Sequence, residues 1–352
     1  YNMAYAAISK PSLHFNTLQY EGNGSNSHAI TGVGFKPDFV WIKSEDQNSY
    51  DHMLFDKVRG DVAGPYDIRS NLTNVQSTDS SGLVSFDTDG FTLNNGGYVN
   101  HASTFNSWNW KGSNATAVSN SDGSITSSVN ANTAAGFSIV KYTGAGSDAT
   151  VGHGLGAVPT MIMIKSITTT AHDWVVYHQG MGNAKAIALN LSNVEYGATA
   201  WQSTTPTNQV FYIKGGANSV SGSMDFIAYC WTDIKGYSKM GSYTGNGNTD
   251  GTFVYTGFKP AFVNFKRTTG SAANWQLWDN KRDIDNPVER AMHPDTNSLS
   301  SNDQDIDFLS NGFKIRSNQG HLNANNVNFI YQAFAEEPLV ANVGASIPAT
   351  AR

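Results

Sequence analysis

Side chains that could act as nucleophiles or hold phosphate are few in this chain of 352 residues. The lone cysteine, Cys230, stands among aromatic residues, and a lone cysteine can serve as a nucleophile. His153 lies in a glycine-rich run, 152–156, that resembles part of a phosphate-binding loop. No helical pattern follows this run, so the helix N-terminus that would hold phosphate is missing. We therefore expect Cys230 to be a small buried side chain and His153 to be a loop residue.

Acidic residues offer two candidate calcium sites. The run Asp87-Thr-Asp-Gly90 resembles a fragment of a calcium loop, but the turn glycine alone explains it. Asp303, Asp305 and Asp307 recur at every second residue, which puts them on one face of a strand. A bound Ca²⁺ and a solvated strand face are the two interpretations of these three aspartates. No other cofactor is expected.

Carboxyl pairs for glycoside hydrolysis are also missing from the pattern. That reaction needs two positioned acids, one of them with a raised pKa. No glutamate of this sequence lies in the centre of an apolar segment with an acidic partner at a recurring spacing. A Gly-x-Ser-x-Gly nucleophile motif is absent as well. We therefore predict no catalytic residues and no enzymatic activity.

The segments that must position these residues repeat three times along the chain. The marker is a tyrosine followed by Gly-x-Gly, at Tyr20, Tyr142 and Tyr243, with offsets of 122 and 101 residues. Ten residues after the second glycine, each copy has Gly-x-x-Pro and then an apolar segment that ends in lysine. The lysine-ended segments are Phe39–Lys43, Met161–Lys165 and Phe262–Lys266. This register predicts three diverged copies of one module.

The copies have the composition of β-strands, because their apolar segments are short and bounded by Gly, Pro, Asn and Asp. A two-residue period puts Val40 and Ile42 on one face, which we expect to be the core face. We therefore predict an all-β chain of three tandem antiparallel β-sandwich repeats, jelly-roll or lectin-like. The expected boundaries are an extension over 1–12, sandwiches over 13–113, 136–235 and 236–336, a Ser/Asn-rich linker or hairpin over 114–135, and a tail over 337–352.

Tryptophans are the candidate ligand-binding residues. An exposed Trp or Tyr on a sheet can stack on a sugar or anchor a partner. Trp174 and Trp275 share one repeat position, and Trp41 stands on a strand face that is polar in the third copy. The alternative is that Trp41, Trp174 and Trp275 cap the sandwich cores or the interfaces between domains. The lysines at the strand ends, Lys43, Lys165 and Lys266, are expected to have a structural role.

Composition excludes several classes of protein. The net charge is −6 with no basic run, which argues against nucleic-acid binding. One cysteine allows neither an intrachain disulfide nor a multi-cysteine zinc site, and no apolar run of about 18 residues is present to span a membrane. Only 14% of the residues are charged, and a polar surface with so little charge is typical of secreted β-proteins, adhesins and virion surface proteins. The start at Tyr1 suggests a processed product or the C-terminal part of a longer chain.

The motif set resembles an uncharacterised family of β-rich repeat proteins encoded by marine tailed bacteriophages, including those of cyanobacteria. The matching segments are Gly34–Lys43, Asp51–Gly60, Gly236–Gly247, Ala333–Glu336 and Pro348–Arg352. The resemblance implies a virion structural protein, often a tail fibre or tail-associated protein, with a lectin-like sandwich. It carries over no catalytic residues.

We therefore expect a non-enzymatic virion surface protein: a tail fibre, receptor-binding protein or capsid decoration located on the extracellular phage particle. Its expected partners are other copies of itself, as a trimer, other virion proteins and a host surface glycan, with no nucleic acid and no membrane insertion. The first alternative is a carbohydrate-binding module that recognises host glycans. The second is a polysaccharide depolymerase, which needs a carboxylate pair.

Overall fold

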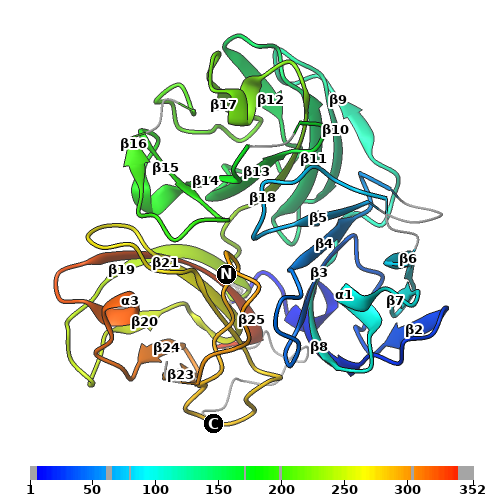
Figure 1. Cartoon of the computed structure of the whole chain (residues 1–352). Helices are drawn as coiled ribbons and strands as arrows, with labels where there is room; N and C mark the ends of the chain where they lie inside the picture. Colours follow the sequence, from blue (N-terminus) through cyan, green and yellow to red (C-terminus); the bar gives the residue numbers. More distant parts are fainter. Residues whose placement is uncertain are drawn as a thin grey trace, which may run out of the picture.

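The computed structural model describes residues 6–60, 66–78, 81–169, 172–197, 200–302 and 305–339, and this part of the chain is all-β. Its strands form several antiparallel sheets, and its α-helices are three single turns. Figure 1 shows the sheets gathered into three lobes around a common centre. The first lobe comprises residues 11–110, the second 118–231 and the third 238–338. No helix in the described ranges is long and apolar enough to cross a membrane.

Each lobe contains one larger and one smaller group of strands. In the first lobe the larger sheet has the order β1 (Phe15–Glu21), β8 (Thr104–Trp110), β3 (Phe39–Ser44), β4 (Met53–Asp56) and β5 (Asp67–Arg69). The smaller sheet has the order β2 (His28–Thr31), β7 (Gly90–Leu93) and β6 (Leu83–Asp87). A 3₁₀ turn, Pro11–Leu13, precedes β1, and the helical turn α1 (Gly97–Asn100) leads from β7 into β8.

The larger sheet of the second lobe has eight strands, more than any other sheet of the described residues. Its order is β16 (Tyr196–Gly197), β15 (Lys185–Ala188), β14 (Val175–His178), β13 (Met161–Ser166), β18 (Asp225–Trp231), β11 (Phe137–Thr143), β10 (Ser127–Asn132) and β9 (Val118–Asn120). The smaller pair is β12 (Ala149–Gly152) with β17 (Val210–Ile213), and a 3₁₀ turn, Gln179–Met181, and α2 (Asn218–Ser221) complete the lobe.

The third lobe has a larger sheet of the order β19 (Ser238–Thr244), β25 (Asn328–Pro338), β21 (Phe258–Arg267) and β22 (Gln276–Asp279). Its smaller sheet is β20 (Phe253–Tyr255), β24 (Gly312–Ile315) and β23 (Ile306–Leu309), followed by α3 (Gly320–Asn323). The order β1-β8-β3-β4 of the first lobe thus has the counterparts β11-β18-β13-β14 and β19-β25-β21-β22.

The tyrosine of each Tyr-x-Gly-x-Gly motif joins a strand to the helical turn of its lobe. Tyr20, Tyr142 and Tyr243 are buried, and each stacks on a phenylalanine of the neighbouring strand. Their hydroxyls donate hydrogen bonds of 2.8 Å to the carbonyl oxygens of Val99, Val220 and Leu322. These bonds hold α1, α2 and α3 against the same corner of each larger sheet.

The first glycine of each motif is required by a close approach of two backbones. A Cβ atom on Gly22 would lie 1.9 Å from the carbonyl oxygen of His101. The corresponding distances are 2.1 Å for Gly144 and 2.3 Å for Gly245, again to carbonyl oxygens. No side chain fits at such distances. The first glycine of the motif is therefore required because the turn passes close to the segment that precedes β8, β18 or β25.

Apolar side chains form one core inside each lobe. Val40 and Ile42 lie in the core of the first lobe, between its larger and smaller sheets. The corresponding pairs are Ile162 with Ile164 in the second lobe and Val263 with Phe265 in the third. The predicted core face of the lysine-ended strand is therefore confirmed.

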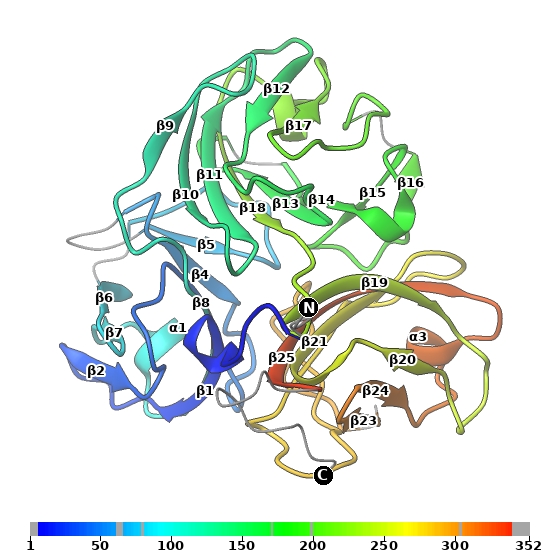
Figure 2. The same cartoon turned by 180° about the vertical axis from the view of Figure 1, so that it is seen from behind.

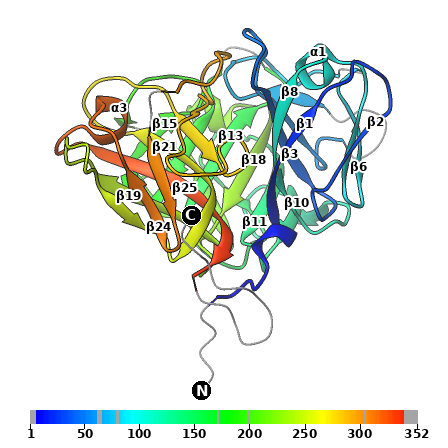
Figure 3. The same ribbon diagram turned by 90° about the horizontal axis from the view of Figure 1, so that it is seen from below.

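A fourth core lies where the lobes meet, on the other face of the larger sheets. Phe39, Phe137 and Phe262, one from each lobe, belong to this shared core. Its aromatic rings contact each other across lobes, as in the stack of Phe39 on Tyr229, with ring centroids 4.4 Å apart. Figure 3 shows the strands of the three larger sheets converging on this centre. The central strands β3, β13 and β21 are therefore buried on both faces, although the sequence predicted only one.

The segment 114–135, predicted as a linker, contains two strands of the second lobe. β10 pairs with β11 over its full length, and β9 pairs with β10, as Figure 2 shows. The hairpin alternative is therefore what the chain forms. The polar composition has a reason, because the Asn130 side chain donates a hydrogen bond of 3.0 Å to the Asp38 carboxylate of the first lobe. Composition alone predicts a linker for this segment, but its polar side chains join the first and second lobes.

Candidate functional site

The three tryptophans proposed as ligand-binding residues lie inside the molecule. Trp41, Trp174 and Trp275 are at most 1% exposed, and all three belong to the shared core. The Trp41 indole donates a hydrogen bond of 2.9 Å to Nδ1 of His52. None of them offers a ring face on which a sugar could stack. The neighbouring lobes cover this face of the sheet, which the sequence had suggested could be exposed. Their surroundings match the alternative, in which they fill cores and interfaces.

Two of these tryptophans form polar contacts between lobes. Nε1 of Trp174 donates to the carbonyl oxygen of Arg69 at 2.9 Å, and Nε1 of Trp275 donates to that of Ala188 at 2.9 Å. Each tryptophan directly precedes the counterpart of β4, which is β14 in the second lobe and β22 in the third, and its bond joins that strand to the preceding lobe. In the first lobe this position holds His52, which is fully buried, and the third lobe lies beside it. Burial lowers the pKa of His52 well below its usual value, so the imidazole is neutral.

Strand-end residues close a second set of contacts between lobes. The Asp56 carboxylate accepts a hydrogen bond of 2.7 Å from the Tyr229 hydroxyl of the second lobe. Asp279 accepts one of 3.1 Å from the Trp108 indole of the first lobe, and Nε2 of His178 lies 3.1 Å from the carbonyl oxygen of Tyr331 in the third. The final residue of each of β4, β14 and β22 therefore contacts a strand of another lobe: β4 contacts β18, β14 contacts β25 and β22 contacts β8.

The charges of these strand-end residues are balanced. Arg59 pairs with Asp56, and Nε of Arg282 lies 2.7 Å from Asp279, with all four side chains buried. Burial acts to raise the pKa of Asp279, but the Arg282 charge and the hydrogen bonds from Arg282 and Lys281 together outweigh it, and the net shift is downward. Burial lowers the pKa of His178 to about 4, so this side chain is neutral at pH 7. The ion pairs and hydrogen bonds of these residues provide fixed polar contacts between the lobes.

The lysines at the strand ends also reach other lobes. Nζ of Lys165 donates to the carbonyl oxygen of Thr73 in the first lobe at 3.0 Å, and Nζ of Lys266 donates to that of Leu191 in the second at 3.0 Å. Lys43 donates to the carbonyl oxygen of Ser44 at 2.9 Å. Burial lowers the pKa of both Lys43 and Lys165 to about 8. These contacts agree with the structural role predicted for the three lysines.

An aspartate and an asparagine exchange places in the third lobe. The Asn71 amide donates to Asp51 at 2.7 Å in the first lobe, and Asn190 donates to Asp173 at 2.7 Å in the second. At the corresponding positions of the third lobe stand Asn274 and Asp295, in the reverse order.

The buried carboxyl group of Asp295 is only half satisfied by hydrogen bonds. One oxygen accepts a hydrogen bond of 3.1 Å from the backbone of Trp275, as the asparagines do in the other lobes, while the other oxygen has no hydrogen-bond partner. Burial raises the pKa of Asp295, and the charge of Lys266 opposes this.

Only part of the proposed calcium site can be described. Asp303 falls outside the described residues, Asp305 precedes β23, and Asp307 lies within it. The Asp307 carboxylate pairs with Nε of Arg316 at 3.3 Å. No group of three or more His, Cys, Asp or Glu side chains that could hold a metal occurs within the described ranges. The calcium site over Asp303, Asp305 and Asp307 remains a prediction.

Three residues of reactive type, Cys230, His153 and Asp87, each occur in one lobe only, and each is held by contacts with that lobe. Cys230 is fully buried in the core of the second lobe, and burial raises the pKa of its thiol. The His153 ring is buried between the carbonyl oxygen of Thr207, at 3.1 Å, and the backbone N–H of Leu155, at 3.2 Å. The Asp87 carboxylate accepts hydrogen bonds from hydroxyl groups of neighbouring residues.

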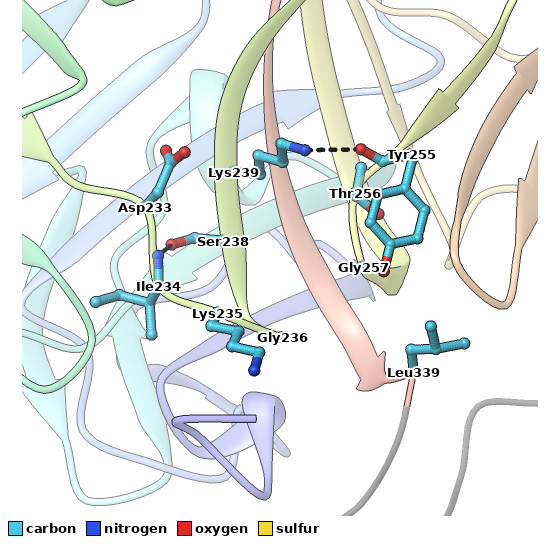
Figure 4. A pocket seen from close by; sticks show the side chains of 10 residues that line it. All are labelled: Asp233, Ile234, Lys235, Gly236, Ser238, Lys239, Tyr255, Thr256, Gly257 and Leu339. Carbon is cyan, nitrogen blue, oxygen red and sulfur yellow. Dashed lines mark hydrogen bonds between the residues drawn. The ribbon is translucent and has the colours of Figure 1, made fainter. Parts of the chain in front are cut away.

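A cleft of about 420 Å³ opens where the second and third lobes join. Figure 4 shows the residues that line it, among them Asp233, Lys235, Lys239, Tyr255 and Leu339. Tyr255 is 53% exposed, which makes it the most exposed aromatic side chain among the described residues. Nζ of Lys239 donates to the backbone carbonyl oxygen of Tyr255 at 2.9 Å and lies 5.6 Å from the centroid of its ring. Together these side chains place an aromatic ring and ammonium groups at one opening.

The cleft is rimmed by residues that the other lobes lack. Strand pairing places Tyr255 at the position of Thr31 in the first lobe and Gly152 in the second. Sequence reasoning missed it because an ungapped alignment on the motif tyrosines puts Tyr255 one residue out of step with Thr31 and two residues out of step with Gly152. The signal available in the sequence was the alternation of the aromatic residues Phe253 and Tyr255 with Val254, which puts the two rings on one face of a strand. In the structure that face is exposed and Val254 is buried.

Comparison with known proteins gives a family without an assigned function. A family model described as Domain of unknown function (DUF7483) matches residues 10–338, and the chain therefore belongs to this family. No curated protein and no solved structure matches the chain.

Proposed function

We propose that this DUF7483 protein is a non-enzymatic structural protein of a bacteriophage virion, as a tail fibre, receptor-binding protein or capsid decoration. In this proposal its three lobes are tandem β-sandwich modules of common origin. The observation that carries it is that the side chains of reactive type described above are occupied by contacts within and between the lobes. A rigid surface body needs such contacts, whereas catalysis needs reactive groups at an open site.

Three diverged modules explain the correspondences between the lobes. The buried tyrosines and the close-approach glycines recur with corresponding partners in each lobe, and a buried lysine recurs in β3, β13 and β21. Each lobe has its own core between two sheets, as a β-sandwich does. Contacts between modules then supply the fourth core, which converts three sandwiches into one rigid body.

The absence of enzymatic activity is proposed from the state of the titratable groups. Asp56 and Asp279 are each paired with an arginine, and His178 is neutral in a buried contact. Burial acts to raise the pKa of Asp279, but its contacts with Arg282 and Lys281 lower it overall, which makes this carboxylate a weak base. Incubating the chain with a host capsular polysaccharide should release no reducing ends above a buffer control. Release would favour a depolymerase instead.

Location on the virion is proposed from composition and from the resemblance of the motif set to phage tail proteins. Immunogold labelling of purified particles, with an antibody against this chain, should mark the particle surface. Mass spectrometry of the same particles should find the chain at a constant ratio to the capsid protein. Particles free of the chain would contradict the proposal.

Self-association is part of the same proposal, since closed homo-oligomers are the usual state of such proteins. Light scattering on the purified chain should give a multiple of the chain mass of 37.9 kDa, three for the proposed trimer. A mass of one chain at micromolar concentration would contradict the trimer and leave virion location to the particle experiment.

A further inference from the structure

We propose that the cleft formed by the third lobe and the connection that leads into it from the second lobe binds an acidic saccharide, such as a segment of a uronic-acid polysaccharide. The inference deepens the proposed function, since a virion surface protein meets host polysaccharide. Its basis is the cleft lined by Tyr255, Lys239 and Lys235. The tryptophans predicted from the sequence take no part in it.

The aromatic component of the site is Tyr255 on β20; Phe253 lies on the same face of this strand but does not line the cleft. Val254 points into the core of the third lobe, so Phe253 and Tyr255 project from the opposite face of the strand. They are 43% and 53% exposed, which is unusual for side chains of this size. The C–H groups on one face of a sugar ring pack well on such rings, while the hydroxyls at the edge remain free for hydrogen bonds.

The cationic component selects the charge of the sugar. Lys239 and Lys235 both line the cleft, although the chain as a whole carries a net charge of −6. An ammonium group has three N–H donors, and Lys239 gives one to the Tyr255 carbonyl oxygen. A carboxylate or sulfate on a sugar stacked at Tyr255 would accept another in a charge-assisted hydrogen bond.

One acidic side chain, Asp233, also lines the cleft. Its carboxylate is held by the backbone N–H of Met240, at 2.8 Å, and by the Thr160 hydroxyl, at 3.0 Å. In the view of Figure 4, Lys239 lies between this carboxylate and Tyr255. Burial raises the pKa of Asp233, and the hydrogen bonds from Met240 and Thr160 and the charge of Lys239 act in the opposite direction.

Comparison of the lobes separates this cleft from features that maintain the fold. The first lobe has Asn16 and Thr31 at the positions of Lys239 and Tyr255, as the strand registers show. The second lobe has Ser138 and Gly152 there. Residues that hold each lobe together recur in all three, whereas these do not. The cleft volume of about 420 Å³ falls within the range of small-ligand sites and suits one or two sugar rings.

A titration of the full chain tests the proposal. An alginate hexasaccharide, in which every ring carries a carboxylate, is compared with neutral maltohexaose by isothermal calorimetry at low salt. We expect heat of binding for the alginate alone, weakening as NaCl is raised. Tyr255→Thr and Lys239→Asn, which install the first-lobe residues, should each weaken binding by about tenfold.

The matched control is Tyr196→Ala, which removes another exposed tyrosine far from the cleft and should leave binding unchanged. Thermal unfolding of each variant verifies that the fold is kept, as expected for exposed positions. No binding of the alginate at millimolar concentration, equal binding of both sugars, or full binding by Tyr255→Thr would each overturn the proposal. None of these outcomes bears on the labelling of particles, so the failure of this site can be told from failure of the virion assignment.

Discussion

The indole nitrogen of Trp174 donates a hydrogen bond of 2.9 Å to the carbonyl oxygen of Arg69, a residue 105 positions earlier and in another lobe. Trp275 forms the same bond with Ala188 of the lobe that precedes it. Both bonds lie beside an apolar core, where an unmade hydrogen bond is costly. The lobes are thus held at a fixed mutual position by directional contacts as well as by apolar burial.

Replacing one of these indoles should destabilise the whole chain. Trp174→Phe keeps an aromatic ring but leaves the Arg69 carbonyl without its donor and opens a void, so we expect a loss of about 2–4 kcal/mol in the free energy of unfolding. Urea denaturation followed by circular dichroism measures it. The exposed Tyr196→Phe serves as control and should change the value by less than about 0.5 kcal/mol. A Trp174→Phe chain of wild-type stability would show that this contact does not hold the lobes.

The glycine after each motif tyrosine should not tolerate a methyl group. In Gly144→Ala the new Cβ would lie 2.1 Å from the carbonyl oxygen of Gly222, and relief requires the backbone to move. We expect a loss of about 2 kcal/mol or more. Gly197→Ala is the matched control in the same lobe, since no atom lies within 4 Å of its added Cβ. Thermal unfolding of both variants decides the matter, and equal melting temperatures would refute the close-approach explanation.

Alkaline pH should stabilise the chain over a limited window. The pKa of Lys43 and of Lys165 falls to about 8 in the folded state from 10.5 in the unfolded chain. The unfolded chain therefore binds more protons above pH 8, and the free energy of unfolding should rise with pH until tyrosine ionisation opposes it near pH 10. Denaturant titrations at pH 7.5, 8.5 and 9.5 measure the slope. Lys165→Met should lower that slope, and an unchanged slope would contradict the role of this buried lysine.

Exchanging the amide and the acid of the third lobe should stabilise it at neutral pH. The double variant Asn274→Asp/Asp295→Asn reproduces the pair of the second lobe, where the amide donates to the acid at 2.7 Å. Since burial raises the pKa of Asp295, the wild-type contribution of this group is present at low pH and lost as pH rises above its ordinary pKa of 3.8.

The double variant should therefore gain about 1 kcal/mol at pH 7 and little at pH 4, as measured by denaturant titration. The single variant Asp295→Asn is the comparison, because it removes the acid and leaves the neutral Asn274 amide where the pair of the second lobe has a carboxylate acceptor. A double variant less stable than the wild type at pH 7 would show that Asp295 is kept for its charge beside Lys266.

The sequence predicted the β-strands and their inward faces well, because both depend on local rules. The two-residue period placed Val40 and Ile42 correctly in a core, since strand geometry decides which side chains share a face. Prediction failed for the opposite face. Trp41 stands where another copy has Asn264, which suggests a polar surface, yet both side chains are buried.

What the sequence by itself determined is the module: its strands, its turns and the glycines and tyrosines that recur at fixed spacing. These follow from contacts within about a hundred residues of chain. Only the tertiary structure decided what covers the outer face of each larger sheet, and so it alone turned Trp174 and Trp275 from candidate ligand-binding residues into contacts between lobes. It also brought Lys239 and Tyr255 together at a cleft. The physical reason is that periodicity records which side chains share a face, while the partner of that face comes from a distant part of the chain.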